Sequence, residues 1–231
     1  MPRRARARDR ERTAPKPGPM TAPPRPTPAR APSSPSPESV VRDLIEQTPG
    51  VAAPDPQASP LRVVIEGPVR ILFMDLDGTL TNGVITYDTV ADARHFWIRD
   101  GLALQWAKQH GILPVVISGR PSRAAELRME DLSLEYYLDV KDKVAVADKV
   151  RRREKAEWRQ CVMVGDDLPD VALMKQVGWA IAVADADPHV KKFAQSVTLA
   201  RAGYGAIREV VEHLLKHNGV WQKVLQHYEA T

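Results

Sequence analysis

The chain contains a single cysteine, Cys161, among 231 residues. One cysteine excludes a disulfide framework and a zinc site built from thiolates. Its position beside Val162 in an apolar run predicts a buried small side chain rather than a reactive thiol. The sequence also has no apolar run long enough to cross a membrane, and its start lacks the apolar segment of a secretory signal. We therefore expect a cytoplasmic protein without a membrane span, because a reducing compartment disfavours disulfides.

An excess of basic charge is likewise missing from most of the chain. Residues 1–30 hold nine basic and two acidic side chains, a charge of +7, whereas the whole chain carries +4. The remainder is therefore about −3, and a folded part with this balance is not expected to bind nucleic acid. The basic tail could make weak contacts with nucleic acid, anionic lipid or an acidic partner, or it could be a solvated extension without a partner.

Composition also predicts the domain organisation. Residues 1–37 are rich in proline, arginine and alanine, and we expect them to be disordered because they have too little apolar surface to offset the chain entropy. Residues 38–47 carry apolar side chains at helical spacing and predict a short helix, which Pro49 and Gly50 end. Residues 1–60 thus form a predicted tail and linker, and residues 61–231 form the predicted globular domain.

The most informative stretch follows the apolar run at residues 69–74, which predicts a buried strand. Asp75 and Asp77 come directly after it, followed by Gly78 and Thr79. Because side chains alternate along a strand, the two carboxylates should project to the same side. They could act as a pair, with one as nucleophile or metal ligand and the other as proton carrier. The alternative is an ordinary Asp-Gly turn after a strand.

Further strands and helices alternate along the rest of the chain. Predicted strands lie at residues 112–117, 136–140, 160–164, 179–183 and 196–198, and predicted helices at 100–110, 121–132, 143–153, 171–177, 188–194, 205–217 and 220–228. In the first helix, Asp100 is the expected cap, and Leu102, Leu104, Trp106 and Ala107 are the expected buried positions. Two β-rich runs, 84–87 and 94–98, predict a hairpin after the first strand. The pattern predicts an α/β, Rossmann-like fold of three layers, a parallel sheet with helices on both faces, with a small β-hairpin flap and no large cap domain.

Polar clusters end three of the predicted buried strands, and a lysine begins one helix. They comprise Asp75 and Asp77, then Ser118, then Asp166, Asp167 and Asp170, with Lys143 at the start of the 143–153 helix. The carboxyl ends of parallel strands meet at one edge of the sheet, so these side chains should lie together. Crowded carboxylates without His or Cys favour Mg²⁺, and a lysine and a hydroxyl suit a phosphoryl group. With no Gly-rich nucleotide loop in the chain, the spacing predicts a magnesium site for phosphoryl transfer.

Each of these residues also has a plainer interpretation. Ser118 could be a turn residue, Lys143 could be a surface lysine with Lys141 as a competitor, and the acids after residue 165 could cap the following helix. Capping explains one acid but not three.

In order and spacing, these segments resemble the four motifs of the haloacid dehalogenase-like phosphatase superfamily. The motifs are Asp75-Leu76-Asp77-Gly78-Thr79, Ser118-Gly119-Arg120, Lys143 and Gly165-Asp166-Asp167-x-x-Asp170. Other segments resemble the capless subfamily of 3-deoxy-D-manno-octulosonate 8-phosphate phosphatases, namely Thr81-Asn82-Gly83, Phe96-x-x-Arg99-Asp100-Gly101, Ser122-x-Ala124-x-Glu126-x-Arg128 and Gly205-Ala206-x-Arg208-Glu209. The resemblance covers residues 69–214 and does not reach the tail.

The resemblance implies a Mg²⁺-dependent phosphomonoester hydrolase that acts on a phosphorylated sugar acid through an aspartyl-phosphate. Asp75 would be the nucleophile, and Asp77 would protonate the leaving group and then deprotonate water. Asp75, the backbone carbonyl of Asp77 and Asp166 would hold the metal. Asp170, and Asp167 beside it, would hold metal-bound waters or orient Lys143.

The resemblance also assigns residues to the substrate. Ser118, Gly119 and Lys143 would contact the phosphoryl oxygens, with Lys143 counted among the catalytic residues. Arg99 and Arg120 are candidates for a substrate carboxylate, unless each pairs with a local acid.

The hairpin departs from the subfamily pattern Gly-Glu-x-x-Lys, because this chain has Val90, Ala91 and Arg94 where the pattern has Gly, Glu and Lys. The expected substrate is 3-deoxy-D-manno-octulosonate 8-phosphate, and the departure leaves open another sugar-acid phosphate or an aryl phosphate. A non-catalytic scaffold is a further alternative, although it would not need both Asp75 and Asp77.

The family's members close their open sites by forming tetramers, so the resemblance implies a homotetramer. Apolar hairpin side chains would form its interface, or would pack on their own domain instead. These side chains are Val84, Ile85, Phe96 and Trp97.

Overall fold

The computed structural model describes residues 61, 64–87 and 92–230. All of them belong to one of the two units of the chain, residues 50–231. The tail and linker predicted at residues 1–60, the short helix predicted at 38–47, and Val90 and Ala91 of the hairpin lie outside the described residues.

A six-stranded parallel sheet forms the centre of the domain, in the order β5-β4-β1-β6-β7-β8. Its strands are β1 (Ile71–Met74), β4 (Leu113–Ile117), β5 (Glu135–Tyr137), β6 (Cys161–Gly165), β7 (Trp179–Ala182) and β8 (Ser196–Val197). All four residues of β1 are fully buried, as expected for a strand covered on both faces. The predicted parallel sheet is confirmed.

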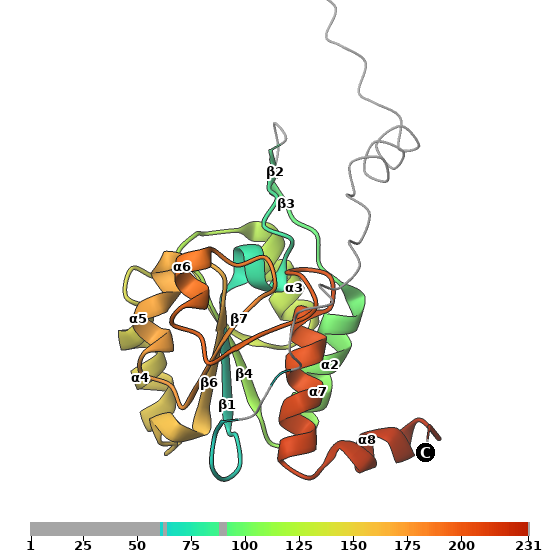
Figure 1. The fold of residues 1–231 in the computed structure, drawn as a ribbon. Coiled ribbons are helices and arrows are strands. Elements are labelled where there is room, and N and C mark those ends of the chain that lie inside the picture. Colours follow the sequence, from blue (N-terminus) through green and yellow to red (C-terminus); the bar gives the residue numbers. More distant parts are fainter. Residues whose placement is uncertain (1–60, 62–63, 88–91, 231) are drawn as a thin grey trace, which may run out of the picture. The chain divides into compact units, whose positions relative to one another are not determined.

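Helices cover both faces of this sheet, which confirms the predicted three layers (Figure 1). One face carries α2 (Ile98–Gln109) and α7 (Ala206–His217), and the other carries α4 (Lys143–Arg153), α5 (Val171–Met174) and α6 (Pro188–Lys191). The remaining helices are α3 (Arg123–Asp131) and α8 (Trp221–His227). The side chains of Ser122 and Asp142 cap α3 and α4, so both helices begin at fixed points beside the carboxyl ends of the strands.

Helix α2 differs from its prediction in two respects. It begins at Ile98, so Asp100 lies in its first turn rather than at its cap, and there Asp100 is fully buried. One carboxylate oxygen of Asp100 accepts a hydrogen bond from the backbone N–H of Arg208 at 2.7 Å, which joins α2 to α7. Leu102 is 40% exposed and not in the core, because the face that packs inwards carries Leu104 and Ala107.

The predicted hairpin is present, but its second strand lies earlier in the sequence than the predicted run 94–98. It consists of β2 (Thr86–Tyr87) and β3 (Asp92–Ala93), and it projects from the domain in Figure 1. Beyond β3 the chain leaves the ribbon, and Phe96 forms only an isolated bridge with Thr81 before α2 begins. The reason is that the side chain of Arg94 is buried against the domain, where an extended ribbon would have left it exposed.

The apolar hairpin residues divide between the surface and the domain. Val84 and Tyr87 are exposed, whereas Phe96 packs against the core and the ring of Trp97 contacts that of Tyr204 in a tilted arrangement. Ile85 is half-buried. Packing on the parent domain therefore accounts for Phe96 and Trp97, and exposed apolar surface remains towards the tip of the flap.

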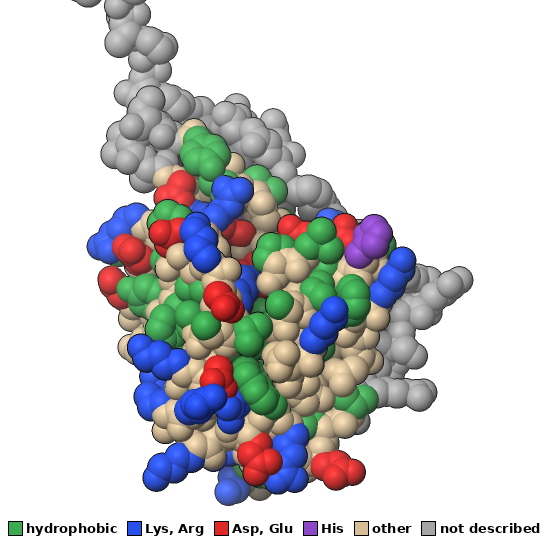
Figure 2. Space-filling model, turned by 90° about the vertical axis from the view of Figure 1, so that its left-hand side faces the viewer, with side chains coloured by type: hydrophobic (Ala, Val, Ile, Leu, Met, Phe, Trp, Pro, Cys, Tyr) green, Lys and Arg blue, Asp and Glu red, His purple; other side chains and the backbone are tan. Residues whose placement is uncertain are grey.

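The surface carries mixed charge. Figure 2 shows basic and acidic side chains interspersed over the face that it presents, with hydrophobic groups between them. On α4, Arg151 and Arg152 pair with Asp148, and Arg153 pairs with Glu135. Within the described ranges, no helix is long and apolar enough to span a bilayer.

Candidate active site

The register of the three central strands determines which residues meet at the carboxyl ends of the strands. Met74 of β1 lies opposite Val116 of β4 and Val164 of β6. The chain therefore leaves the sheet at nearly the same height at Asp75 on the central strand and at Ser118 and Asp166 on its two neighbours. This confirms that residues separated by more than forty positions meet at one edge of the sheet.

The turn after β1 brings its backbone against Asp166. This turn, η1 (Leu76–Leu80), contains Gly78 with a φ of +89°, a left-handed conformation that favours glycine. A Cβ at Gly78 would lie 2.1 Å from a carboxylate oxygen of Asp166, so the close approach also requires glycine. Thr79, which is buried, donates a hydrogen bond to the other oxygen of Asp166 at 2.8 Å. The sequence does not predict this role for Thr79, because its partner lies 87 positions away.

The turn after β6 is folded around Asp170. One oxygen of this buried carboxylate accepts hydrogen bonds from the backbone N–H groups of Asp166 and Asp167. Asp167 itself is exposed, and its side chain accepts from the N–H of Leu168. Local capping thus accounts for Asp167, as its plainer interpretation held, whereas Asp166 and Asp170 belong to the cluster.

Lys143 lies between two of the acids. Its Nζ is 2.6 Å from Asp75 Oδ1 and 2.7 Å from Asp170 Oδ1, and only 7% of its side chain is exposed. Although burial alone would lower the pKa of Lys143, the charges of Asp75 and Asp170 hold that pKa above its usual range. Its competitor Lys141 is exposed and pairs with Asp139. Of the two lysines, Lys143 therefore lies among the acids and Lys141 lies at the surface.

Asp75, Asp166 and Asp170 form a compact acidic cluster, with one oxygen of each lying within 4.8 Å of the others. Burial, reinforced by repulsion between the carboxylates, raises the pKa of Asp75 to about 6 and that of Asp166 to about 7. The fully ionised cluster is therefore unfavourable unless a cation joins it in addition to Lys143. Its donors are all carboxylate oxygens, which fit a hard divalent cation such as Mg²⁺.

Asp77 points to a different partner. It lies in the η1 turn with φ −82° and ψ 112°, so the alternation of the preceding strand does not set its direction. Arg94, from the segment after β3, donates to both of its oxygens, from Nε at 2.6 Å and from Nη2 at 3.1 Å. The sequence does not predict this pairing, because it shows Arg94 only as a departure from a family pattern.

The predicted substrate residues are distributed unevenly. Ser118 is buried at the end of β4, and its hydroxyl accepts from the N–H of Arg120 at 3.3 Å. Gly119 is exposed in the following turn. Arg99, at the start of α2, and Arg120 are both exposed, and among the described residues neither forms an ion pair with the acidic cluster.

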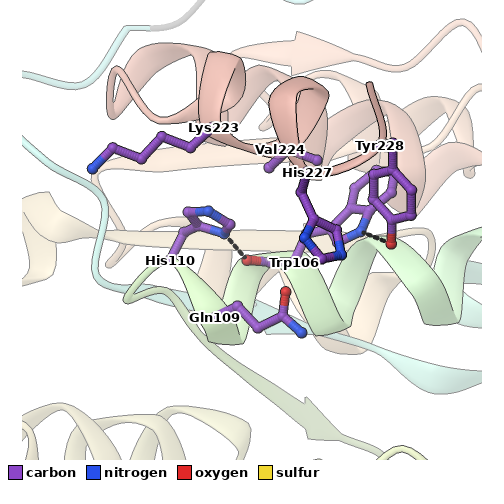
Figure 3. A pocket seen from close by; sticks show the side chains of 7 residues that line it. All are labelled: Trp106, Gln109, His110, Lys223, Val224, His227 and Tyr228. Carbon is purple, nitrogen blue, oxygen red and sulfur yellow. Dashed lines mark hydrogen bonds between the residues drawn. The ribbon is translucent and has the colours of Figure 1, made fainter. Parts of the chain in front are cut away.

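A separate cavity of about 180 Å³ lies between α2 and α8, away from these acids. Trp106 and Tyr228, which line it, are joined by a hydrogen bond of 3.1 Å (Figure 3). Its other lining residues are Gln109, His110, Lys223, Val224 and His227. It contains none of the residues that the motifs identify, so the candidate active site is the acidic cluster.

Comparisons with known proteins identify the family of the chain. Residues 139–210 match the family model of the haloacid dehalogenase-like hydrolases. The 3-deoxy-D-manno-octulosonate 8-phosphate phosphatase of Haemophilus influenzae is 30% identical over 153 residues, which cover 65% of this chain and 85% of that protein.

Two solved structures are similar as well. The 3-deoxy-D-manno-octulosonate 8-phosphate phosphatase of Moraxella catarrhalis, in complex with a magnesium ion, a phosphate ion and a KDO molecule, superimposes with a TM-score of 0.67 at 29% identity, covering 69% of this chain and 93% of that one. A hypothetical protein from Xanthomonas campestris has a TM-score of 0.68 at 34% identity, covering 69% and 88%.

Proposed function

Because the chain belongs to the haloacid dehalogenase-like phosphatase superfamily, in the capless subfamily that resembles 3-deoxy-D-manno-octulosonate 8-phosphate phosphatase, we propose that it hydrolyses a phosphorylated sugar acid through an aspartyl-phosphate. One observation carries the proposal. The carboxylate of Asp75 lies at the mouth of the central strand, held by the ammonium of Lys143 and close to Asp166.

In the first step, an oxygen of Asp75 attacks phosphorus while the bond from phosphorus to the leaving oxygen breaks. A carboxylate is a competent nucleophile only when ionised, and a pKa of about 6 leaves Asp75 mostly ionised above pH 7. Asp77 gives its proton to the leaving alkoxide. In the second step Asp77 takes a proton from water, whose oxygen attacks phosphorus as the bond to Asp75 breaks.

Lys143 and Ser118 would donate hydrogen bonds to the phosphoryl oxygens, with the N–H of Gly119 beside them. Mg²⁺, held by Asp75, Asp166 and the backbone carbonyl of Asp77, would supply positive charge between two anionic groups that otherwise repel. Asp170 would keep Lys143 in place through the ion pair already formed at 2.7 Å.

The proposed substrate is 3-deoxy-D-manno-octulosonate 8-phosphate. Support comes from the relatives that carry this substrate in their names and from the Moraxella structure, which contains Mg²⁺, phosphate and the sugar acid. A second candidate is another sugar-acid phosphate or an aryl phosphate. It is favoured by Arg94, which pairs with Asp77 where the subfamily pattern has lysine. Arg99 and Arg120 remain proposed contacts for a substrate carboxylate.

We further propose a homotetramer in the cytoplasm, with the flap covering an open site. The support is the short hairpin itself, whose exposed Val84 and Tyr87 leave apolar surface to cover. The basic tail is proposed to be dispensable for catalysis.

A substrate panel tests the proposal. The purified protein is assayed for phosphate release from 3-deoxy-D-manno-octulosonate 8-phosphate, other sugar-acid phosphates, neutral sugar phosphates and 4-nitrophenyl phosphate, each with Mg²⁺ and with a chelator. We expect Mg²⁺-dependent turnover with the highest kcat/KM for a sugar acid. Undiminished turnover in chelator would contradict the metal site. A preference for neutral sugars would contradict the substrate class.

A further inference from the structure

The buried guanidinium of Arg94 connects the β2–β3 hairpin to Asp77 in the η1 turn. Arg94 follows β3, yet only 2% of its side chain is exposed. Its Nε and Nη2 donate to the two oxygens of Asp77, and its Nη1 contacts Asp92 and the hydroxyl of Ser122. One side chain therefore contacts three segments, which are the flap, the η1 turn and the cap of α3.

Two of the partners of Arg94 also form a hydrogen bond with each other. The hydroxyl of Ser122 donates to Asp92 and also accepts from the N–H of Ala125 at the start of α3. The guanidinium is thus fixed by the base of the flap and by a helix cap, both independently of Asp77. A planar guanidinium makes two parallel contacts with a carboxylate, which lysine cannot do. The plane of the Asp77 carboxylate is consequently defined by Arg94.

We propose that Arg94 is a positioning residue, which holds the carboxylate of Asp77 in the orientation needed for proton transfer. The inference rests on the proposed role of Asp77. A carboxylate oxygen accepts through two lone pairs, so one bond from the guanidinium leaves each oxygen a site for the transferred proton. Without Arg94, the Asp77 side chain would be free to rotate, and proton transfer requires a donor within hydrogen-bond reach of the reacting oxygen.

This role has a signature that a purely structural role lacks. Proton donation matters most when the leaving group is a poor one and least when it is stable as an anion. Benzyl phosphate, phenyl phosphate and 4-nitrophenyl phosphate share a ring of similar size but release increasingly stable oxyanions. A positioning residue for the acid should therefore affect benzyl phosphate most and 4-nitrophenyl phosphate least.

The experiment measures kcat/KM for these three esters with wild type, Arg94→Gln, Arg94→Lys, Asp77→Asn and the control Arg123→Gln. The control removes an exposed guanidinium that pairs with Glu126 on α3, next to Ser122. For Arg94→Gln we expect the loss with benzyl phosphate to exceed the loss with 4-nitrophenyl phosphate by about tenfold, with Arg94→Lys intermediate. Asp77→Asn should show the same order more strongly, and Arg123→Gln should match wild type.

The results distinguish failure of the positioning role of Arg94 from failure of the proposed function. Equal losses on all three esters for both Arg94 variants, with the graded loss kept in Asp77→Asn, would overturn the role of Arg94 and leave the proposed function standing. Wild-type rates in Asp77→Asn would overturn the proposed function itself. If Arg94→Gln does not fold, Arg94→Lys decides, because an ungraded effect there likewise rejects the positioning role.

Discussion

Replacing Lys143 with methionine should destabilise the protein in a strongly pH-dependent way. The substitution keeps the length of the side chain and removes an ammonium that lies 2.6 Å from Asp75 and 2.7 Å from Asp170. Loss of one partner from a buried ion pair costs about 3–5 kcal/mol, because the remaining charge has no compensation. Here two carboxylates would face each other, and the loss should lie towards the upper end of that range at pH 8.

The sign of the pH dependence follows from Asp75. Burial and Asp170 already raise its pKa to about 6, and removing the lysine, which lowers that pKa, raises it further. The folded variant can therefore keep a proton at Asp75, which relieves the repulsion, whereas Asp75 of the unfolded chain loses its proton near the usual pKa of 3.8. Because the folded state then binds the extra proton, the loss of stability grows as the pH rises from that value towards the raised pKa.

Urea denaturation at pH 5.5 and pH 8 measures both effects. We expect a loss towards the upper end of about 3–5 kcal/mol at pH 8 and a clearly smaller loss at pH 5.5. The control is Lys141→Met, which removes an exposed lysine paired with Asp139 and should change stability by less than about 1 kcal/mol. A loss for Lys143→Met that is the same at both pH values, or no greater than that of the control, would refute the account of the ion pair.

Three further predictions test other parts of the structure. Burial raises the pKa of Asp100 to about 6, so the folded state keeps a proton that the unfolded chain has already lost, and the free energy of unfolding falls as the pH rises towards 6. In urea titrations, Asp100→Asn should reduce the loss of stability between pH 5 and pH 8 by roughly 1–1.5 kcal/mol. The same loss in the variant as in the wild type would contradict the raised pKa. Gly78→Ala should lower turnover at least about tenfold, because the added Cβ would lie 2.1 Å from a carboxylate oxygen of Asp166. The control Gly111→Ala has a similar φ of +81° but nothing within 4 Å, so it should lower stability by about 1–2 kcal/mol and leave turnover unchanged. Equal turnover in the two variants would refute the role of the contact with Asp166. Light scattering should give the mass of a tetramer, and Val84→Glu combined with Tyr87→Glu should lower that mass, so a monomeric wild type with full activity would contradict the proposed assembly.

Much of the fold was predictable because its signals are local in the sequence. The run Ile71–Met74 is apolar throughout and becomes a strand buried on both faces, as such runs predict. Helix α4 has its predicted bounds, Lys143–Arg153, with Asp142 as the cap. From these elements the parallel topology follows, and the topology alone brings Asp75 and Asp166 to one edge of the sheet.

The rest depended on side-chain directions in turns, which sequence periodicity does not determine. Asp77 lies beyond the end of β1, so the rule of alternation did not apply to it, and its partner Arg94 comes from a flap whose second strand lies earlier in the sequence than predicted. Thr79 contacts Asp166 across 87 positions of sequence, and no local pattern indicates such a pair. An aspartate at position 100 is typical of a helix cap, but Asp100 is instead buried and accepts a hydrogen bond from the backbone of α7.

The central claim is that Asp75 attacks phosphorus, and trapping the intermediate tests it most directly. The protein is mixed with substrate and Mg²⁺, quenched in acid within a single turnover, digested, and analysed by mass spectrometry beside Asp75→Asn. The account predicts a phosphoryl group on the peptide that contains Asp75 in the wild type, together with no adduct and no turnover in the folded variant. Near wild-type turnover by Asp75→Asn, or a phosphoryl group on a different residue, would contradict it.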